Sequence, residues 1–214
     1  MKRILCYGDS NTWGYTPGSG VRFAPEVRWT GRVAQALQGR CTILEAGLNG
    51  RTTVYDDPCL PCRNGKAGLG YELVSRKPID ILVLSLGTND LKFTGAAASA
   101  KGLNQLLRLC SQADICFDSG SSPIFGKDAR ILVISPIALH PDLDKSFPDS
   151  TFAGKYGQSL LFARHYAPVA QAWCAEFLDA GEYAQASPAD CVHMDAPSHA
   201  RLAQAVAEKL AAML

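Results

Sequence analysis

The sequence predicts a three-layer α/β domain built on a five-stranded parallel sheet. Short apolar segments alternate along the chain with longer segments of helical periodicity, which is the pattern of strand–helix crossovers. Two of the apolar segments are hydrophobic at nearly every position, as strands are when helices cover both faces of a parallel sheet. The length of 214 residues, with 47% hydrophobic and 19% charged residues, fits one folded domain over residues 1–214.

Five apolar segments are predicted strands, because each is too short for a helix and is bounded by Gly, Pro or Asp. In chain order they are residues 3–7, 41–45, 79–86, 130–135 and 175–179. The third and the fourth are the two that are apolar nearly throughout. In open α/β sheets ligands bind outside the carboxyl ends of the strands, so we expect the site at that edge.

Four segments carry apolar residues at helical spacing and are predicted helices. They are residues 29–37, 97–109, 159–173 and 198–214. Two long segments rich in Pro, Gly and Asp, residues 51–70 and 138–157, follow the second and the fourth strand. We interpret both as loops that help to build the pocket.

Charge and hydropathy exclude several classes of partner. Twenty-one basic and twenty acidic residues leave a formal net charge of +1, which gives no electrostatic reason to expect nucleic acid or an anionic membrane. No apolar run approaches the roughly 18 residues of a membrane helix. Asp9 interrupts the N-terminal segment before a signal peptide could form. The sequence therefore predicts a cytoplasmic protein.

The eight cysteines do not form a recognisable metal site. Cys59 and Cys62 make a CxxC pair in the first of the two long loops. A structural zinc ion would need two further ligands, and Cys110 and Cys116 are wrongly spaced for that purpose. We expect no metal, and the pair stays open between loop thiols and a reversible disulfide.

The residues that could perform chemistry stand where predicted strands end. The first strand runs into Gly8-Asp9-Ser10, which would present a serine hydroxyl at the edge of the sheet. If a helical turn follows, the backbone N–H of Ser10 points into the site at a helix N-terminus. The alternative is that Asp9 and Ser10 only cap that turn.

Gly47 and Asn89 follow the second and the third strand. A glycine lets a backbone N–H approach a ligand closely, although Gly47 taken alone is more simply a turn glycine. An asparagine can aim its amide N–H at an oxyanion, although Asn89 or Asp90 could equally form an Asx turn or a helix cap.

Asp190 and His193 stand three residues apart, shortly before the last predicted helix. In a tight turn the carboxylate could hold one ring nitrogen and leave the other free as a base. His199 and Asp195 lie nearby and compete for the same assignment. His140 and His165 have no carboxylate three residues before them.

Together these features resemble the SGNH or GDSL-type hydrolase family. Four of its sequence blocks occur in order across essentially the whole chain: Gly8-Asp9-Ser10, Gly47, Gly87-Thr88-Asn89-Asp90, and residues 190–193. Two further stretches, residues 8–14 and 22–31, resemble the bacterial arylesterase and acyltransferase branch. Asn11, where that branch often has leucine, and the loop with Cys59 and Cys62 depart from the branch.

The resemblance implies a flavodoxin-like SGNH hydrolase fold and a cofactor-free serine esterase. Ser10 would be the nucleophile, His193 the general base, and Asp190 the group that orients His193. The oxyanion hole would consist of the N–H groups of Ser10 and Gly47 and the amide of Asn89. The partner would be a small ester, and the branch is often a homo-oligomer. The family also transfers acyl groups to alcohols.

The substrate is the open part of the prediction. As hypotheses, Trp13 lines a short acyl pocket and Phe147 contributes from the second long loop, although Trp13 could instead only pack the first turn onto the sheet. We expect a short-chain aryl or acetyl ester. The alternatives are a lysophospholipase or thioesterase of the same family, and a flavodoxin-like binding domain without turnover.

Overall fold

The computed structural model describes residues 1–117, 120 and 122–214. Five parallel strands form one sheet in the order β2-β1-β3-β4-β5, which confirms the predicted fold class. The strands are β1 (Lys2–Gly8), β2 (Cys41–Gly47), β3 (Ile79–Ser85), β4 (Phe125–Ser135) and β5 (Glu176–Asp179). All five predicted strands are present, and β4 begins five residues earlier than predicted.

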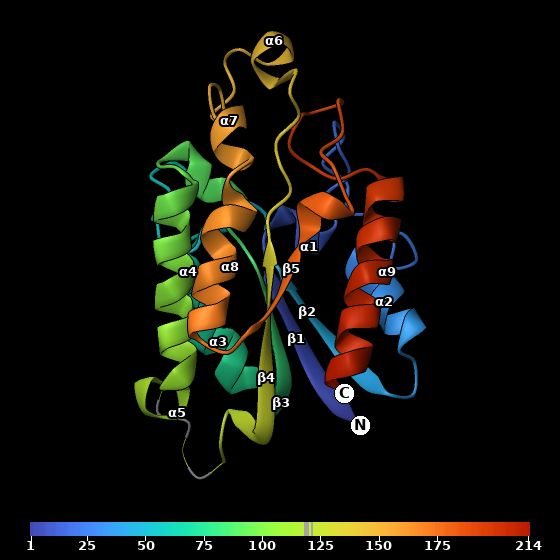
Figure 1. Ribbon diagram of the computed structural model, residues 1–214, viewed down its shortest axis with the longest axis vertical. Helices are drawn as coiled ribbons and strands as arrows, with labels where there is room; N and C mark the ends of the chain where they lie inside the picture. The colour runs from blue at the N-terminus through green and yellow to red at the C-terminus, as the bar shows by residue number, and fades with distance from the viewer. Residues whose placement is uncertain (118–119, 121) are drawn as a thin grey trace.

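Helices cover both faces of this sheet (Figure 1). On one face lie α3 (Gly65–Arg76), α4 (Ala96–Ser111) and α8 (Phe162–Ala172), and on the other α2 (Trp29–Ala36) and α9 (Ala196–Met213). Each side has its own apolar core, with Leu82 and Leu106 in one and Val83 and Val206 in the other. The alternating strand residues therefore supply both cores.

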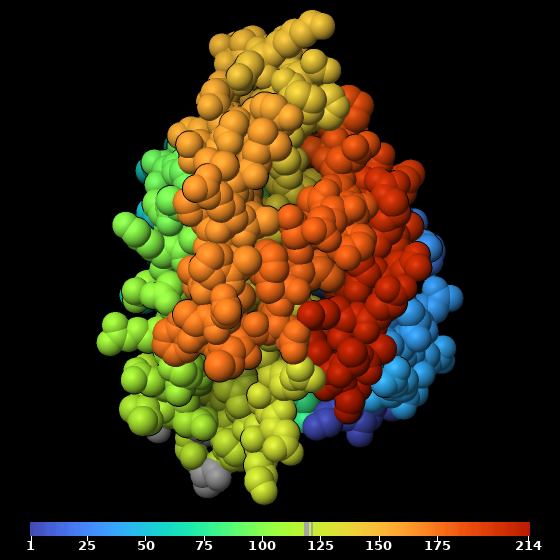
Figure 2. Space-filling view, in the orientation of Figure 1, coloured from blue at the N-terminus to red at the C-terminus, as the bar shows by residue number. Residues whose placement is uncertain are grey.

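Short elements occupy the connections. They are α1 (Ser10–Trp13), η1 (Thr88–Lys92), α5 (Ala113–Cys116), α6 (Leu143–Ser146), α7 (Tyr156–Ser159) and η2 (Ala180–Glu182). The connection with α6 forms the upper tip of the molecule in the space-filling view (Figure 2). Both termini lie at the opposite end of the sheet (Figure 1).

Two predicted boundaries were wrong. The segment predicted as a loop over residues 51–70 ends in a helix, because α3 begins at Gly65, after Asn64 accepts a hydrogen bond from the Ala67 N–H. The helix predicted over residues 159–173 begins later, at Phe162, as α8, and α7 is a separate short helix that shares only Ser159 with the predicted segment.

In the described part of the chain, no helix is both long and apolar enough to cross a membrane.

Candidate active site

The turn after β1 presents Ser10 at the carboxyl edge of the sheet. Asp9 is the N-cap of α1, and its Oδ1 accepts the Asn11 N–H at 3.0 Å. The N–H groups of Thr12 and Trp13 donate to the Asp9 carbonyl at 3.1 and 2.9 Å. Within the described residues, the hydrogen bonds that form this turn leave the N–H of Ser10 without a backbone acceptor. The capping interpretation therefore holds for Asp9, whereas Ser10 keeps its hydroxyl and its N–H for other partners.

The second turn brings Asp190 and His193 together. Oδ1 of Asp190 accepts the backbone N–H groups of Val192 and His193 at 3.0 and 2.9 Å. Its Oδ2 lies 2.8 Å from Nδ1 of the His193 ring. Cys191 adopts a left-handed φ of 63°, which lets the chain reverse between the two. One carboxylate thus shapes the turn and orients the imidazole.

The two turns meet through a side-chain hydrogen bond. Nε2 of His193 lies 2.9 Å from Oγ of Ser10, 183 residues apart in sequence. With Nδ1–H donating to Asp190, Nε2 is left to accept the serine proton. Asp190, His193 and Ser10 therefore form one continuous chain of hydrogen bonds.

Asp190 is the ionised group in this chain of hydrogen bonds. Burial opposes ionisation of its carboxyl, but hydrogen bonds from the His193 ring and backbone outweigh that cost and lower the pKa of Asp190 below its ordinary value. A carboxylate that stays ionised can stabilise an imidazolium on His193.

The Asn11 side chain forms a hydrogen bond that links the two turns. Its Oδ1 accepts the backbone N–H of Met194, next to His193, at 3.0 Å. The side chain is buried, so this bond is made away from bulk water. A leucine at this position could not accept that N–H. The departure from the arylesterase pattern at Asn11 therefore has a structural purpose here.

Tyr15 is a site residue that the sequence analysis missed. Its ring stacks on the His193 ring, with centroids 4.1 Å apart and planes inclined by 26°. The Trp13 ring lies next in line, 6.4 Å from the Tyr15 ring, and the Arg22 guanidinium sits 5.4 Å above the Trp13 centroid. Trp13 is therefore one ring away from the imidazole. The spacing of aromatic residues in the segment after Ser10 was the available signal.

The residues predicted for the oxyanion hole lie at the ends of neighbouring strands. Gly47 is the last residue of β2 and pairs with Gly8 at the end of β1. Gly47 therefore belongs to the strand and not to a turn. The next residue, Leu48, donates its N–H to the Gly8 carbonyl at 3.1 Å, so the Gly47 N–H points to the opposite side, away from β1. A Cβ on Gly47 would lie 2.6 Å from the Trp13 Cα, so the missing side chain makes room for the backbone of α1.

Asn89 lies inside η1 and does not cap it. Its Nδ2 donates one hydrogen to the carbonyl of Arg51 at 3.1 Å. Among the described residues, no acceptor lies within hydrogen-bond distance of the second hydrogen of this amide. The side chain is buried at the same sheet edge as Ser10, because β1 and β3 are neighbours.

Two buried carboxyl groups lie beneath the site. Asp90 accepts hydrogen bonds from the Thr53 N–H and hydroxyl at 2.8 and 2.6 Å and from the Ser99 hydroxyl at 2.7 Å. Burial raises the pKa of Asp90 to about 6, and it does the same for Asp9. Asp90 therefore ties the segment after β2 to α4.

The other histidines weighed in the sequence make hydrogen bonds away from Ser10. His199 is buried in α9, and its Nδ1 accepts the Trp29 N–H at 3.2 Å. Burial lowers the pKa of His199 to about 4, so it is neutral. Asp195 caps α9 by accepting the Ser198 N–H at 2.8 Å, and Nδ1 of His140 accepts the Asp142 N–H.

Phe147 lies farther out than the other predicted residues. It follows α6 in the connection that forms the tip of the molecule, and 38% of its surface is exposed. Within the described residues, the Phe147 ring contacts no other aromatic ring of the site.

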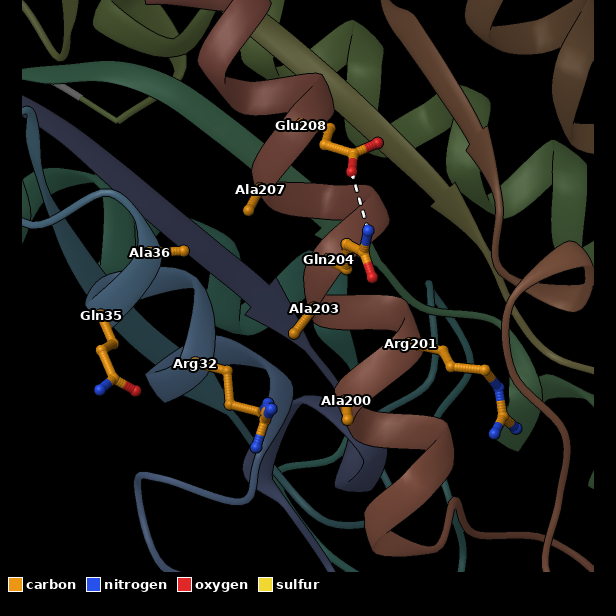
Figure 3. Close-up of a pocket in the computed structure, with 9 residues that line it drawn as sticks. All are labelled: Arg32, Gln35, Ala36, Ala200, Arg201, Ala203, Gln204, Ala207 and Glu208. Carbon is orange, nitrogen blue, oxygen red and sulfur yellow. Dashed lines mark hydrogen bonds between the residues drawn. The ribbon is translucent and has the colours of Figure 1, made fainter.

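A groove of about 530 Å³ lies elsewhere, between α2 and α9 (Figure 3). Its lining combines small, amide and charged side chains: Arg32, Gln35, Ala36, Ala200, Arg201, Ala203, Gln204, Ala207 and Glu208. It contains neither Ser10 nor His193, so we assign it no part in the chemistry. Over residues 1–117, 120 and 122–214, no three His, Cys, Asp or Glu side chains are grouped as ligands of one metal ion.

Comparison with known proteins agrees on one class, the carboxylic ester hydrolases. The model of the GDSL-like lipase/acylhydrolase family matches residues 6–206, and the chain belongs to that family. The resemblance seen in the sequence motifs is thereby confirmed. A search of curated proteins found no significant match.

Solved structures extend this similarity over the full length. A carbohydrate acetylesterase family member from Sinorhizobium meliloti is 35% identical, with a TM-score of 0.89 over 100% of this chain and 99% of that one. The aryl esterase of M. smegmatis is 33% identical, with a TM-score of 0.88 and complete coverage of both chains. A putative arylesterase from Agrobacterium tumefaciens is 32% identical, with a TM-score of 0.85 and complete coverage of both chains.

Proposed function

We propose that the protein hydrolyses short-chain aryl or acetyl esters through an acyl-enzyme on Ser10. The hydrogen-bonded chain from Asp190 through His193 to Ser10, at 2.8 and 2.9 Å, is the observation that carries this proposal. The full-length similarity to structures described as an aryl esterase and a carbohydrate acetylesterase supports the substrate class.

In the first step, Oγ of Ser10 attacks the ester carbonyl while Nε2 of His193 removes the hydroxyl proton. Asp190 holds the other ring nitrogen and stabilises the imidazolium that forms. The N–H group of Ser10 and the Asn89 amide bind the oxyanion of the tetrahedral intermediate. His193 then returns its proton to the leaving alcohol, which departs and leaves the acyl group on Ser10.

In the second step, His193 removes a proton from a water molecule, whose oxygen attacks the acyl carbonyl carbon. The bond from that carbon to Oγ of Ser10 then breaks, His193 returns its proton to Oγ, and the acid is released. An alcohol in place of water gives a new ester, so the same site serves acyl transfer. The Tyr15 ring stacks on His193 and the Trp13 ring lies next to Tyr15. These bulky rings limit the room beside His193 and favour a small acyl group. Phe147 remains the outer candidate for substrate contact.

The test is hydrolysis of p-nitrophenyl acetate, butyrate, octanoate and palmitate by the wild type and by Ser10→Ala. We expect rapid acetate turnover that decreases with acyl length and is lost in the variant, by roughly 10³-fold or more because the nucleophile is absent. Trp13→Ala in the same series should shift the preference toward longer chains.

Other outcomes would select the alternatives. Preference for the long chains would favour a lysophospholipase or thioesterase. Equal, slow rates in the wild type and in Ser10→Ala, together with saturable ligand binding, would favour a binding domain without turnover. The predictions of a homo-oligomer and of a cytoplasmic location belong to the same proposal, and light scattering and cell fractionation test them.

A further inference from the structure

Tyr166 is a buried tyrosine next to the turn that carries Asn89. It lies on α8, and only 1% of its surface is exposed. Its hydroxyl donates to the carbonyl of Leu86 at 3.0 Å, and Leu86 directly follows β3, three residues before Asn89. A buried hydroxyl needs a partner, and here the partner is the backbone at the start of the turn.

A second hydroxyl joins Tyr166 to the other end of the turn. Oγ of Ser99, on the neighbouring helix α4 (Figure 1), lies 2.6 Å from the Tyr166 oxygen and donates to Oδ2 of Asp90 at 2.7 Å. The Ser99 hydrogen is used in that bond. The single Tyr166 hydrogen is then shared between Ser99 Oγ and the Leu86 carbonyl, as a three-centre bond. The two hydroxyls therefore hold the chain at Leu86, before Asn89, and at Asp90, after it.

The same chain of hydrogen bonds fixes the acceptor of the Asn89 amide. Asp90 also accepts the Thr53 N–H at 2.8 Å and the Thr53 hydroxyl at 2.6 Å. Two residues before Thr53, the Arg51 carbonyl accepts one hydrogen of the Asn89 amide at 3.1 Å. One network thus holds both the backbone of Asn89 and the carbonyl that orients its side chain.

Gly87 makes the turn dependent on this network. Its φ is 138°, and a Cβ there would lie 2.9 Å from Ser99 Oγ and closer still to the Tyr166 oxygen. The two hydroxyls therefore occupy the place of a side chain. Glycine allows this backbone conformation but does not enforce it, so the bonds on either side of Gly87 select one conformation of the turn.

We propose that Tyr166 is a positioning residue of the oxyanion hole, which together with Ser99 holds the turn from Leu86 to Asp90 so that the Asn89 amide faces the oxyanion. The inference rests on the proposed function and deepens it. Tyr166 acts through Asn89 rather than on the substrate. Its effect belongs to the transition state, because the amide meets a negative oxygen only there.

The test compares Tyr166→Phe with the wild type, because phenylalanine keeps the packed ring and removes only the hydroxyl. We expect kcat for p-nitrophenyl acetate to decrease about tenfold with KM nearly unchanged, a part of the roughly hundredfold loss expected when the whole Asn89 amide is removed. A trifluoromethyl ketone, which forms an anionic hemiketal on Ser10, should bind more weakly by a similar factor. In an Asn89→Ala background the same change should have little effect on kcat, because the amide that Tyr166 positions is absent.

Tyr7→Phe is the matched control. Tyr7, on β1, is also fully buried, and its hydroxyl also donates to a backbone carbonyl, that of Gly65, at 2.6 Å. That bond holds the first residue of α3 and not the turn with Asn89. The control should lose stability as Tyr166→Phe does, and keep kcat and affinity for the ketone. All rates are referred to folded enzyme, measured by circular dichroism and by active-site titration.

Two outcomes would overturn the proposal. One is a folded Tyr166→Phe enzyme with wild-type kcat and wild-type affinity for the ketone. The other is the same factor of loss in kcat with and without Asn89→Ala, because a residue that acts through Asn89 needs its amide. If Tyr166→Phe does not fold, Ser99→Ala removes the second hydroxyl and is judged by the same two outcomes.

Failure of this inference is distinguishable from failure of the proposed function. If Ser10→Ala is inactive while Tyr166→Phe is normal, the inference fails and the proposed function stands. If Ser10→Ala is as active as the wild type, the proposed function itself fails.

Discussion

The Asn89 amide donates one hydrogen to the Arg51 carbonyl, and we expect the second to meet the oxyanion. Asn89→Ala should lower turnover of p-nitrophenyl acetate by roughly a hundredfold or more, about 2.7–4 kcal/mol of transition-state stabilisation, while the fold survives. Steady-state kinetics and thermal unfolding measure the two quantities. Unchanged turnover would remove Asn89 from the hole.

Asn104→Ala is the control for loss of a partly buried hydrogen bond to a side-chain amide. Asn104 lies on α4 and accepts the Trp173 indole N–H at 2.7 Å, away from Ser10. It should cost stability by about 1 kcal/mol, as a typical hydrogen bond does, and leave kcat unchanged.

Individual site residues were predictable where a short motif contains them. Asp190 and His193 stand three residues apart, and a single turn brings them together. Ser10 and Asn89 follow strands directly, so strand prediction alone places them at one edge. Tyr15 belongs to no such motif. Only the aromatic spacing after Ser10 indicated it, because its stacking partner, the His193 ring, is distant in sequence.

At the scale of elements, the contact between α1 and the end of β2 positions the nucleophile. A Cβ on Gly47 would lie 2.6 Å from the Trp13 Cα and 2.7 Å from the Thr12 carbonyl carbon, so one backbone segment would have to move. Gly47→Ala should therefore lower turnover at least tenfold and cost about 1–3 kcal/mol of stability, as overpacking does.

Gly157→Ala is the comparison for this change. A Cβ on Gly157, in α7, would meet no atom within 4 Å, so stability should be retained or slightly increased, since alanine favours helix. Kinetics and denaturant unfolding of both variants make the measurement. If Gly47→Ala kept wild-type turnover, the close approach of α1 and β2 would not govern the position of Ser10.

The elements that sequence reasoning found are those with regular apolar periodicity, and α3 shows why others were missed. Its glycines read as loop residues, yet Gly70 is there because a Cβ would lie 2.6 Å from the Phe117 ring. Helix propensity was overruled by tertiary packing, which a single sequence does not display. The signals that were present are the N-cap Asn64 and the buried pair Leu69 and Leu73, spaced four residues apart.

For the whole molecule, the buried carboxyl groups should shape the pH dependence of stability. Burial raises the pKa of Asp90 from 3.8 to about 6, and that of Asp9 likewise. Between these pH values the folded chain holds protons that the unfolded chain has released. The free energy of unfolding contributed by these groups is therefore full below about pH 4 and falls as the pH rises to 6.

Asp90→Asn isolates this contribution, because an amide resembles the protonated carboxyl and does not titrate. Relative to the wild type, the variant should gain stability as the pH rises from 4 to 6, by up to about 3 kcal/mol, and the difference should then level off. Urea unfolding at several pH values measures it. Asp128→Asn, which removes an exposed carboxyl on β4, controls for surface charge. Parallel curves for Asp90→Asn and the wild type would mean that Asp90 is ionised in the folded protein throughout this range, with its hydrogen bonds from Thr53 and Ser99 offsetting the cost of burial.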